Sequence, residues 1–219
     1  MTPPPSDPSP IETDPLHVVF NRGLAALGLL LTSPLLALAA IIISLDGLFC
    51  PADRGPVFYR EQRISKGRPF SIIKFRTMQS AAIEEVLAQG LTVKHLERQR
   101  RGQTRVGNFL RRFYLDELPQ FINILRGEMS FVGPRPCAPS EYERELSRGI
   151  VRKRLATAGL VGLQQANKGR SRTIEEEIAL DYEYVRRAGS MSPLRRLAYD
   201  TSIMVSSLRV LVEGKGLDY

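Results

Sequence analysis

Cysteine and histidine are scarce in this chain, which has 219 residues and only two of each. The cysteines, Cys50 and Cys137, lack the spacing of a metal-binding pair and are too few for a disulfide framework. With so few thiolate and imidazole ligands, a structural zinc site is not expected. The soluble part of the protein therefore fits a reducing, cytoplasmic setting.

Acidic residues are outnumbered by basic ones. The chain has 31 Lys and Arg against 23 Asp and Glu, a net charge of +8, and its pI is about 9.8. This excess predicts an anionic partner, which could be nucleic acid, anionic lipid or a phosphorylated substrate. The length is sufficient for one domain with a real core and an appendage.

Charge is absent from Gly23 to Leu45. As a straight helix this segment would be roughly 35 Å long, enough to cross a membrane. However, Ser33-Pro34 lies at its middle, where proline favours a bend. Lys and Arg, which mark the cytoplasmic side, flank both ends: Arg22 before the segment and Arg54, Arg60, Arg63, Lys66 and Arg68 after it. We therefore favour a re-entrant helix, with both ends in the cytoplasm, over a single straight span.

The chain divides by composition into three parts. Residues 1–16 are rich in Pro, Ser and Asp and predict a disordered tail. Nothing in this tail resembles the charged start of a signal peptide, so a cleaved signal peptide is not expected. Residues 17–48 form the predicted helix-break-helix in the membrane, and residues 49–219 the predicted cytoplasmic domain.

The cytoplasmic part predicts a helix-rich α+β fold. β-branched and aromatic residues around Val57 and Ile72, with Gly67 between them, indicate a two-stranded hairpin. Residues 81–101 predict a basic helix that lies either on an anionic membrane or on the protein surface. Residues 194–212 carry a clearer apolar stripe beside arginines, which is typical of an amphipathic helix at the membrane interface.

Two adjacent carboxylates, Asp116 and Glu117, lie in an otherwise apolar stretch. Such a pair is costly unless a cation or a substrate uses it. Pro119 favours a helix that begins here, where the positive end of the dipole attracts anions, and Gly127 is the expected stop. A bare Asp-Glu pair is more often just a helix cap, so the surrounding residues must decide.

Four blocks of sequence decide the interpretation. Residues 112–136 contain the carboxylate pair and end in Gly-Pro-Arg-Pro, and residues 74–78 read Lys-Phe-Arg-Thr-Met. Together with a glycine-rich block at 158–170 and Leu-Asp-Tyr-Glu-Tyr-Val at 180–185, they closely resemble the bacterial sugar transferases called monotopic phosphoglycosyl transferases. The resemblance covers Val19 to Leu211. It departs at Ala158 and Val161, where the family has Pro and Thr, and at one extra residue before Gly169-Arg170.

The resemblance implies a reaction in two steps at the cytoplasmic face of the bacterial inner membrane. Asp116 would attack a nucleotide diphosphate sugar, usually a UDP-sugar, and release the nucleoside monophosphate. Undecaprenyl phosphate, a polyprenyl phosphate, would then take the sugar phosphate from Asp116 in a ping-pong mechanism, the first membrane step of surface glycan assembly. Glu117 would bind Mg²⁺, and Ser33 and Pro34 would form the membrane helix break. The implied substrate-binding residues are Lys74, Arg111, Arg135, Arg170 and Asp181.

Two other functions are possible for such a chain. A membrane-anchored basic protein could bind nucleic acid, but the basic residues are scattered and no nucleic-acid-binding fold is indicated, so no nucleic-acid partner is expected. A degenerate family member could act as a scaffold, which the altered glycine-rich block favours and the intact Asp116-Glu117 pair opposes. The motifs specify the reaction class and are silent on the sugar and the oligomeric state.

Overall fold

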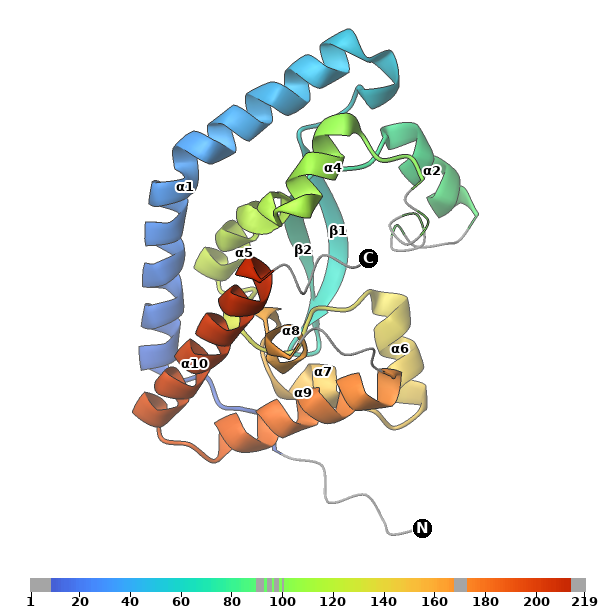
Figure 1. The fold of residues 1–219 in the computed structure, drawn as a ribbon. Helices are drawn as coiled ribbons and strands as arrows, with labels where there is room; N and C mark the ends of the chain where they lie inside the picture. The colour runs from blue at the N-terminus through green and yellow to red at the C-terminus, as the bar shows by residue number, and fades with distance from the viewer. Residues whose placement is uncertain are drawn as a thin grey trace. The chain divides into compact units, whose positions relative to one another are not determined.

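The computed structural model describes residues 9–89, 93, 96, 99, 101–167 and 173–213 (Figure 1). Its fold is helix-rich α+β, as predicted. The chain forms two compact units, which we describe separately. The first unit comprises the described residues within Met1–Ala26, Gln62–Ser71 and Asn123–Asp218, and the second those within Leu27–Glu61 and Ile72–Ile122.

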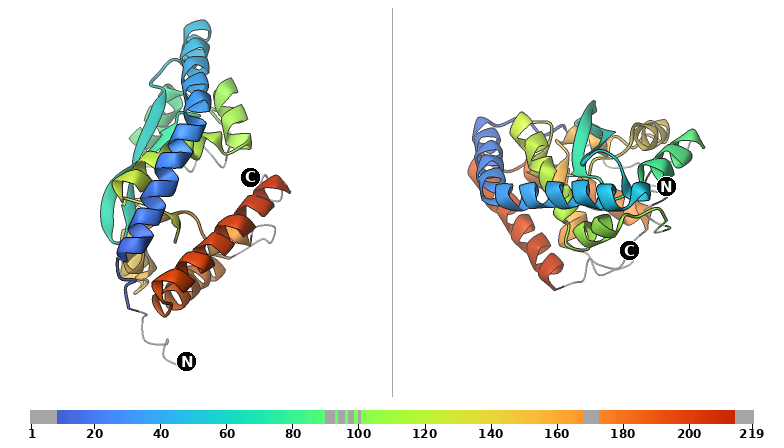
Figure 2. Two further views of the ribbon diagram at one scale, coloured as in Figure 1. Left: turned by 90° about the vertical axis from the view of Figure 1, so that its left-hand side faces the viewer. Right: turned by 90° about the horizontal axis from the view of Figure 1, so that it is seen from above.

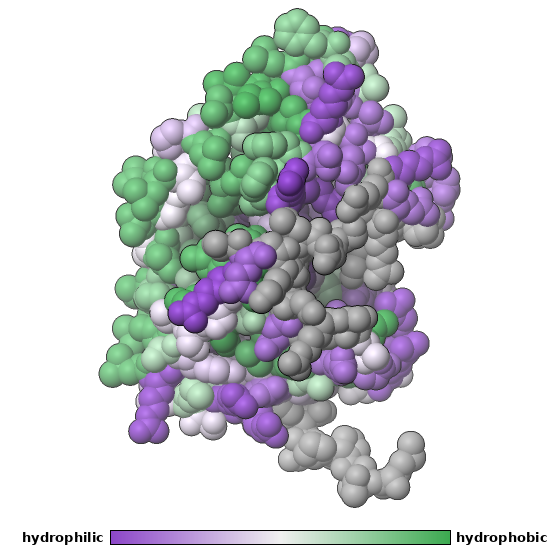
Figure 3. All heavy atoms as spheres, viewed as in Figure 1, coloured by the Kyte–Doolittle hydropathy of each residue, from purple (hydrophilic) through white to green (hydrophobic). Residues whose placement is uncertain are grey.

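Helix α1, Pro15–Phe49, contains the uncharged segment and has 35 residues. It is long and apolar enough to cross a membrane by length and composition, and only 11% of its most apolar window is buried. Figure 3 shows apolar side chains along it. Leu30 and Leu31 are each 71% exposed. Exposed apolar surface of this extent marks an interaction surface rather than a core helix.

The Ser33-Pro34 pair bends α1 without interrupting it. Pro34 lies inside the helix and has no N–H to donate to the carbonyl of Leu30. The Ser33 hydroxyl donates to that same carbonyl, at 2.8 Å, so the freed acceptor is satisfied locally. Hydroxyls that donate to preceding carbonyls also bend helices, and Figure 1 shows α1 as a bent helix. The re-entrant path in a membrane stays a prediction.

The predicted hairpin is confirmed by strands β1, Phe58–Ser65, and β2, Arg68–Phe75. Lys66 and Gly67 form its turn with φ values of 48° and 75°. Two successive residues in the left-handed region form a type I′ turn, whose twist matches the twist of the two strands in a hairpin with a two-residue loop. The sequence therefore fixes the register of this hairpin through its turn.

The first unit also contains a short parallel strand pair that the sequence did not indicate. Strand β3, Ser130–Val132, pairs with β4, Gly159–Val161, and Ser130 lies opposite Gly159. Helix α10, Pro193–Val212, confirms the predicted C-terminal helix and is drawn in red in Figure 2. It packs against α8, β3 and β4. The other helices of the unit are α6, Pro139–Ser147, α7, Arg152–Leu155, α8, Leu163–Ala166, and α9, Ile174–Gly189.

The described part of the predicted tail, residues 9–14, packs against the first unit. Ile11 is 6% exposed, and its N–H donates to the carbonyl of Leu155 at 2.7 Å. The Lys66 ammonium donates in turn to the carbonyl of Ile11, at 2.8 Å. A single apolar residue, Ile11, thus anchors this polar stretch to the first unit. Asp14 then accepts from the Leu16 N–H at the start of α1.

The second unit has two apolar clusters. Ala39 and Ile43 of α1 pack with Phe75 and Leu110, while Met78 forms a second cluster with Val86, Val93 and Leu96. Its elements are η1, Pro51–Asp53, α2, Ser80–Ala88, α4, Arg105–Arg112, and η2, Leu115–Gln120, which continues into α5, Phe121–Arg126. Of the helix predicted over 81–101, α2 covers the first part and the described residues 93, 96 and 99 are helical.

Candidate active site

Asp116 and Glu117 lie in the first turn of η2 in the second unit. This placement confirms the predicted helix start, and Gly127, with φ of 80°, follows the last residue of α5 as predicted. The residue at the N-cap is Tyr114, in the left-handed conformation with φ of 56°, so neither carboxylate occupies the capping position. Because a 3₁₀ helix turns about 120° per residue, the two carboxylates leave the helix in different directions.

The apolar residues around the pair fix η2 against α1. Leu115 packs on the cluster that contains Ala39 and Ile43. A Cβ atom at Gly28 would lie 2.8 Å from the Phe121 ring, so glycine is what allows this ring to approach the helix. The carboxylate pair is therefore held directly beside the most apolar element of the chain.

Lys74 is brought to the carboxylates by β2. Its ammonium lies 3.3 Å from Glu117 Oε1, and the side chains are 18% and 14% exposed, respectively. Asp116 is 8% exposed. Arg111, in the last turn of α4, belongs to a helix that packs against η2. Four predicted site residues thus lie in the second unit, on elements around one 3₁₀ turn.

Arg76, in the same motif as Lys74, has a structural role that the sequence did not reveal. It is 2% exposed, and its guanidinium donates to the carbonyls of Pro56 at 2.7 Å, Asp53 at 2.7 Å and Met78 at 3.1 Å. Burial lowers its pKa from the usual value. A guanidinium with fixed donors suits such a clamp because it binds several carbonyls at once.

Asp181 and Arg135 lie in the first unit, where Asp181 is the centre of a buried network. Its Oδ2 accepts from Arg152 at 2.8 Å and Lys153 at 2.9 Å, and its Oδ1 accepts from Gln164 at 3.1 Å. Lys153 also donates to the carbonyl of Arg135, at 2.7 Å. Asp181 therefore positions both the Gly-Pro-Arg-Pro turn and the glycine-rich block. Its direct contact with substrate stays a prediction.

The glycine-rich block owes its glycines to close backbone approach. A Cβ at Gly159 would lie 2.1 Å from the Gly133 amide nitrogen, and one at Gly162 would lie 2.5 Å from the Gly133 carbonyl oxygen. These contacts join the block to the turn that carries Arg135. Arg170, predicted to bind substrate, falls outside the described residues.

Asp200 joins three elements of the first unit, a role that the sequence left unassigned. It is 3% exposed, lies 2.6 Å from His17 Nε2 on α1, and accepts from the Tyr184 hydroxyl of α9 at 3.2 Å. Burial and the Asp200 charge raise the pKa of Tyr184. The separation of 183 residues between His17 and Asp200 explains why no local pattern could reveal this contact.

Among the residues that the structure describes, two sets could hold a metal. Asp116 and Glu117 offer only oxygen, the donor that Mg²⁺ prefers, and Mg²⁺ commonly takes one or two carboxylates and completes its shell with substrate phosphates. Asp46, Cys50 and Asp53 have ligand atoms within 4.8 Å of one another, although Asp53 Oδ1 accepts from Gln79. The thiol makes this second set unsuited to Mg²⁺.

Comparison with known sequences places the chain in a known family. The chain belongs to the bacterial sugar transferases, whose family model matches residues 13–214. It is 39% identical over 171 residues to the UDP-glucose:undecaprenyl-phosphate glucose-1-phosphate transferase of Escherichia coli K12, covering 74% of this chain and 34% of that protein. It thus spans about a third of that relative's length.

Relatives of more similar length share the match. A protein of the same name from Caulobacter vibrioides is 36% identical over 192 residues, covering 83% of this chain and 67% of the relative. The exopolysaccharide production protein ExoY of Rhizobium meliloti is 36% identical over 178 residues, covering 76% of this chain and 75% of the relative.

Proposed function

We propose that this chain transfers a sugar 1-phosphate from a UDP-sugar to undecaprenyl phosphate, giving an undecaprenyl diphosphate sugar and UMP. The observation that carries the proposal is the family match over residues 13–214, which includes the Asp116-Glu117 turn. The names of the Escherichia coli and Caulobacter vibrioides relatives support the same substrates.

Asp116 is the proposed nucleophile. One of its carboxylate oxygens attacks the phosphorus that carries the sugar, and the bond from this phosphorus to the oxygen of the UMP leaving group breaks. UMP departs with the electron pair, leaving the sugar phosphate on Asp116. A phosphate oxygen of undecaprenyl phosphate then attacks the same phosphorus and displaces the carboxylate. Each step forms one P–O bond and breaks one.

Glu117 is the proposed Mg²⁺ ligand, because its carboxylate leaves the same turn in another direction and is only partly exposed. The bound cation would neutralise charge on the phosphate oxygens. The Lys74 ammonium, 3.3 Å from Glu117 Oε1, supplies a second positive charge beside the Glu117 carboxylate. Arg111, Arg135 and Arg170 remain proposed substrate-binding residues.

The position of η2 on α1 supports a reaction at the membrane surface. Leu115 and Phe121 fix the carboxylate turn against the apolar helix. A lipid phosphate that arrives in the plane of the bilayer would meet Asp116 there. We propose that α1 enters the inner membrane as a re-entrant helix, that the catalytic residues face the cytoplasm, and that α10 lies at the interface. The product would begin the assembly of a surface glycan.

Release of UMP tests this proposal. Purified full-length protein is incubated with Mg²⁺, undecaprenyl phosphate and a panel of UDP-sugars, alongside Asp116→Asn and Glu117→Gln. We expect UMP with at least one sugar and its loss in both variants, while membrane association is unchanged. Normal turnover in Asp116→Asn would refute the nucleophile, and no turnover by folded protein across the panel would refute the reaction.

A further inference from the structure

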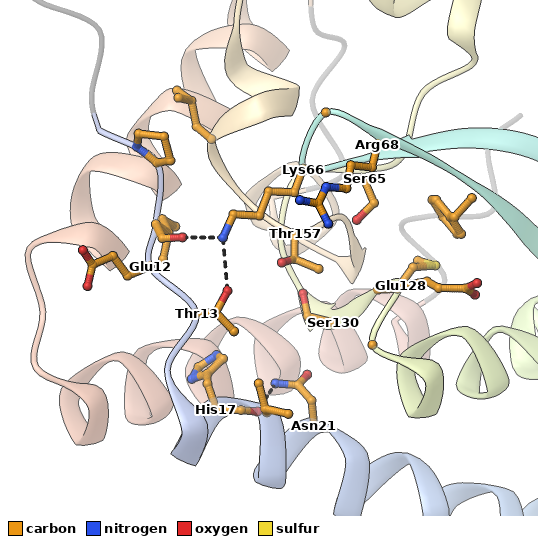
Figure 4. Close-up of a pocket in the computed structure, with 18 of the residues that line it drawn as sticks. Glu12, Thr13, His17, Asn21, Ser65, Lys66, Arg68, Glu128, Ser130 and Thr157 are labelled. Atoms are coloured by element: carbon orange, nitrogen blue, oxygen red, sulfur yellow. Dashed lines mark hydrogen bonds between the residues drawn. The ribbon is translucent and has the colours of Figure 1, made fainter.

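The first unit contains a cavity that the proposed reaction does not use. It has a volume of about 980 Å³ and is lined by residues 10–14, the first turns of α1, the turn of the hairpin, residues 127–130, and residues around α7 (Figure 4). Among the described residues that line it, none is a predicted catalytic or substrate-binding residue. The size would admit a phosphate with an attached organic group.

Positive charge predominates in this cavity. Five basic residues line it, against three acidic ones: Arg22, Lys66, Arg68, Arg154 and Arg196 against Glu12, Asp14 and Glu128. One of the acidic residues, Glu128, is engaged elsewhere, since it accepts from the Asn123 amide at 2.6 Å. Asp14 caps α1 through Oδ1, while its Oδ2 is buried and has no hydrogen-bond partner among the described residues. Figure 4 shows the Glu12 side chain pointing away from Lys66 and Arg68.

Lys66 is fixed within this group of cations. Its ammonium donates to the carbonyl of Ile11 at 2.8 Å and to the Thr13 hydroxyl at 3.2 Å. Burial lowers its pKa, and the neighbouring charges of Arg196 and Arg68 lower it further, against a smaller opposing effect of the Glu12 carboxylate. Like charges that are brought together in this way repel one another, so a bound anion would stabilise them.

His17, which lines the same cavity, has an unsatisfied polar atom beside it. The side chain lines the cavity, and the residue is 6% exposed. The Asp200 carboxylate can only accept, so the 2.6 Å contact assigns an N–H to His17 Nε2. Its Nδ1 is buried and has no hydrogen-bond partner among the described residues. A buried polar atom without a partner is costly and indicates a ligand or a bound water.

We propose that this cavity binds a phosphate-type oxyanion, with Lys66, Arg68 and Arg154 around its oxygens and His17 Nδ1 completing the hydrogen bonds. The imidazolium form of His17 would donate to the anion, and the neutral form would accept from a protonated phosphate oxygen. Several cations around one space favour an anion with several oxygens over a carboxylate. The phosphate belongs either to a soluble metabolite or to a phospholipid head group.

Calorimetric titration with inorganic phosphate, at constant ionic strength, tests the site on the full-length protein in non-ionic detergent. A second arm measures the unfolding temperature in micelles with and without phosphatidylglycerol. Arg68→Gln/Arg154→Gln removes two exposed cations that line the cavity, so the fold should persist, and we expect about tenfold weaker binding or more. Arg148→Gln/Arg186→Gln makes the same charge change at exposed positions of the same unit outside the cavity.

The two histidines of the chain provide a direct readout. In ¹⁵N spectra of histidine-labelled protein, phosphate should shift one imidazole, and His17→Gln should remove that signal. Saturable binding of inorganic phosphate identifies a soluble ligand, and a response to phosphatidylglycerol alone identifies a lipid head group. No saturable response to either probe, or equal affinity in the two double variants, would overturn the proposal.

Discussion

The ion pair between Lys74 and Glu117 is partly buried, so its charges are poorly screened by solvent. Replacing Lys74 by Gln leaves Glu117 without this cation and removes positive charge from the phosphate site. We expect kcat/KM for UMP release to fall by about a hundredfold. Arg60→Gln changes an exposed cation on the neighbouring strand and should leave kcat/KM within about twofold. Equal rates in the two variants would contradict a role for Lys74.

Gly159 has no room for a side chain. Because Gly133 N would lie 2.1 Å from an added Cβ and Val161 O 2.5 Å from it, Gly159→Ala must separate β3 from β4. We expect a loss of about 1–3 kcal/mol in the free energy of unfolding, measured by denaturant titration in detergent. Gly23→Ala is the matched control, since a Cβ there meets no atom within 4 Å in the described part of the chain. Equal stability of the two variants would refute the close contact.

Cys137 should be inert at neutral pH. Burial raises the pKa of its thiol to about 11, and only the thiolate reacts readily. A maleimide reagent should label the half-buried Cys50 in the native protein and Cys137 only after unfolding. Between pH 9.0 and about 11 the thiol is largely deprotonated in the unfolded chain but still protonated in the folded protein. The free energy of unfolding should therefore fall as the pH rises through that range. Rapid labelling of Cys137 in native Cys50→Ser protein would contradict this prediction.

At the scale of elements, the helices and strands that depend on a local residue pattern could be predicted from the sequence. The hairpin follows from its strand residues and the Lys66-Gly67 turn, and α10 from its apolar stripe. The strand pair β3–β4 could not be predicted, because each strand has three residues and pairs with one 29 residues away (Ser130 with Gly159). The network around Asp181 was missed for the same reason: its partners Arg152 and Lys153 lie 29 and 28 residues away.

The placement of the site was predictable in part. Asp116, Glu117 and Lys74 share one unit, and their motif matches indicated all three. In the sequence, Arg76 and Arg152 look like ordinary exposed basic residues. In the structure both side chains are nearly fully buried, Arg76 as a clamp on carbonyls and Arg152 in salt bridges. A charged residue in a sequence gives no sign that its side chain is buried when its hydrogen-bond partners are backbone carbonyls or carboxylates far away in the sequence.

The bend of α1 depends on Ser33 and Pro34. In Pro34→Leu an N–H is available to the Leu30 carbonyl, and the helix should straighten. A topology reporter on the N-terminus should be inaccessible from outside the cell in the wild type and become accessible in Pro34→Leu. Leu35→Ala alters the adjacent position without restoring an N–H and should behave as wild type. An accessible N-terminus in the wild type would rule out the re-entrant helix.

At the scale of the whole molecule, a net charge of +8 and a long exposed apolar helix give two different reasons to bind a membrane. They respond differently to salt: at about 1 M the screening length falls to about 3 Å, which removes charge-based adsorption, while burial of apolar surface persists. We expect the protein to stay in the membrane fraction after a high-salt wash. Release by salt alone would show that charge holds it there.

The same reasoning locates the anchor. Leu30→Glu/Leu31→Glu places two charges on side chains of α1 that are each 71% exposed, and each charge costs about 2.5–3.5 kcal/mol at the centre of a membrane helix. We expect this variant to lose much of its salt-resistant membrane binding. Ile174→Glu adds a charge at a similarly exposed apolar residue of α9, 66% exposed, and should stay bound. Because the carboxylate turn packs on α1 through Leu115 and Phe121, a variant that leaves the membrane should also lose turnover with undecaprenyl phosphate. Full turnover with undecaprenyl phosphate by the released protein would show that catalysis does not require the membrane anchor.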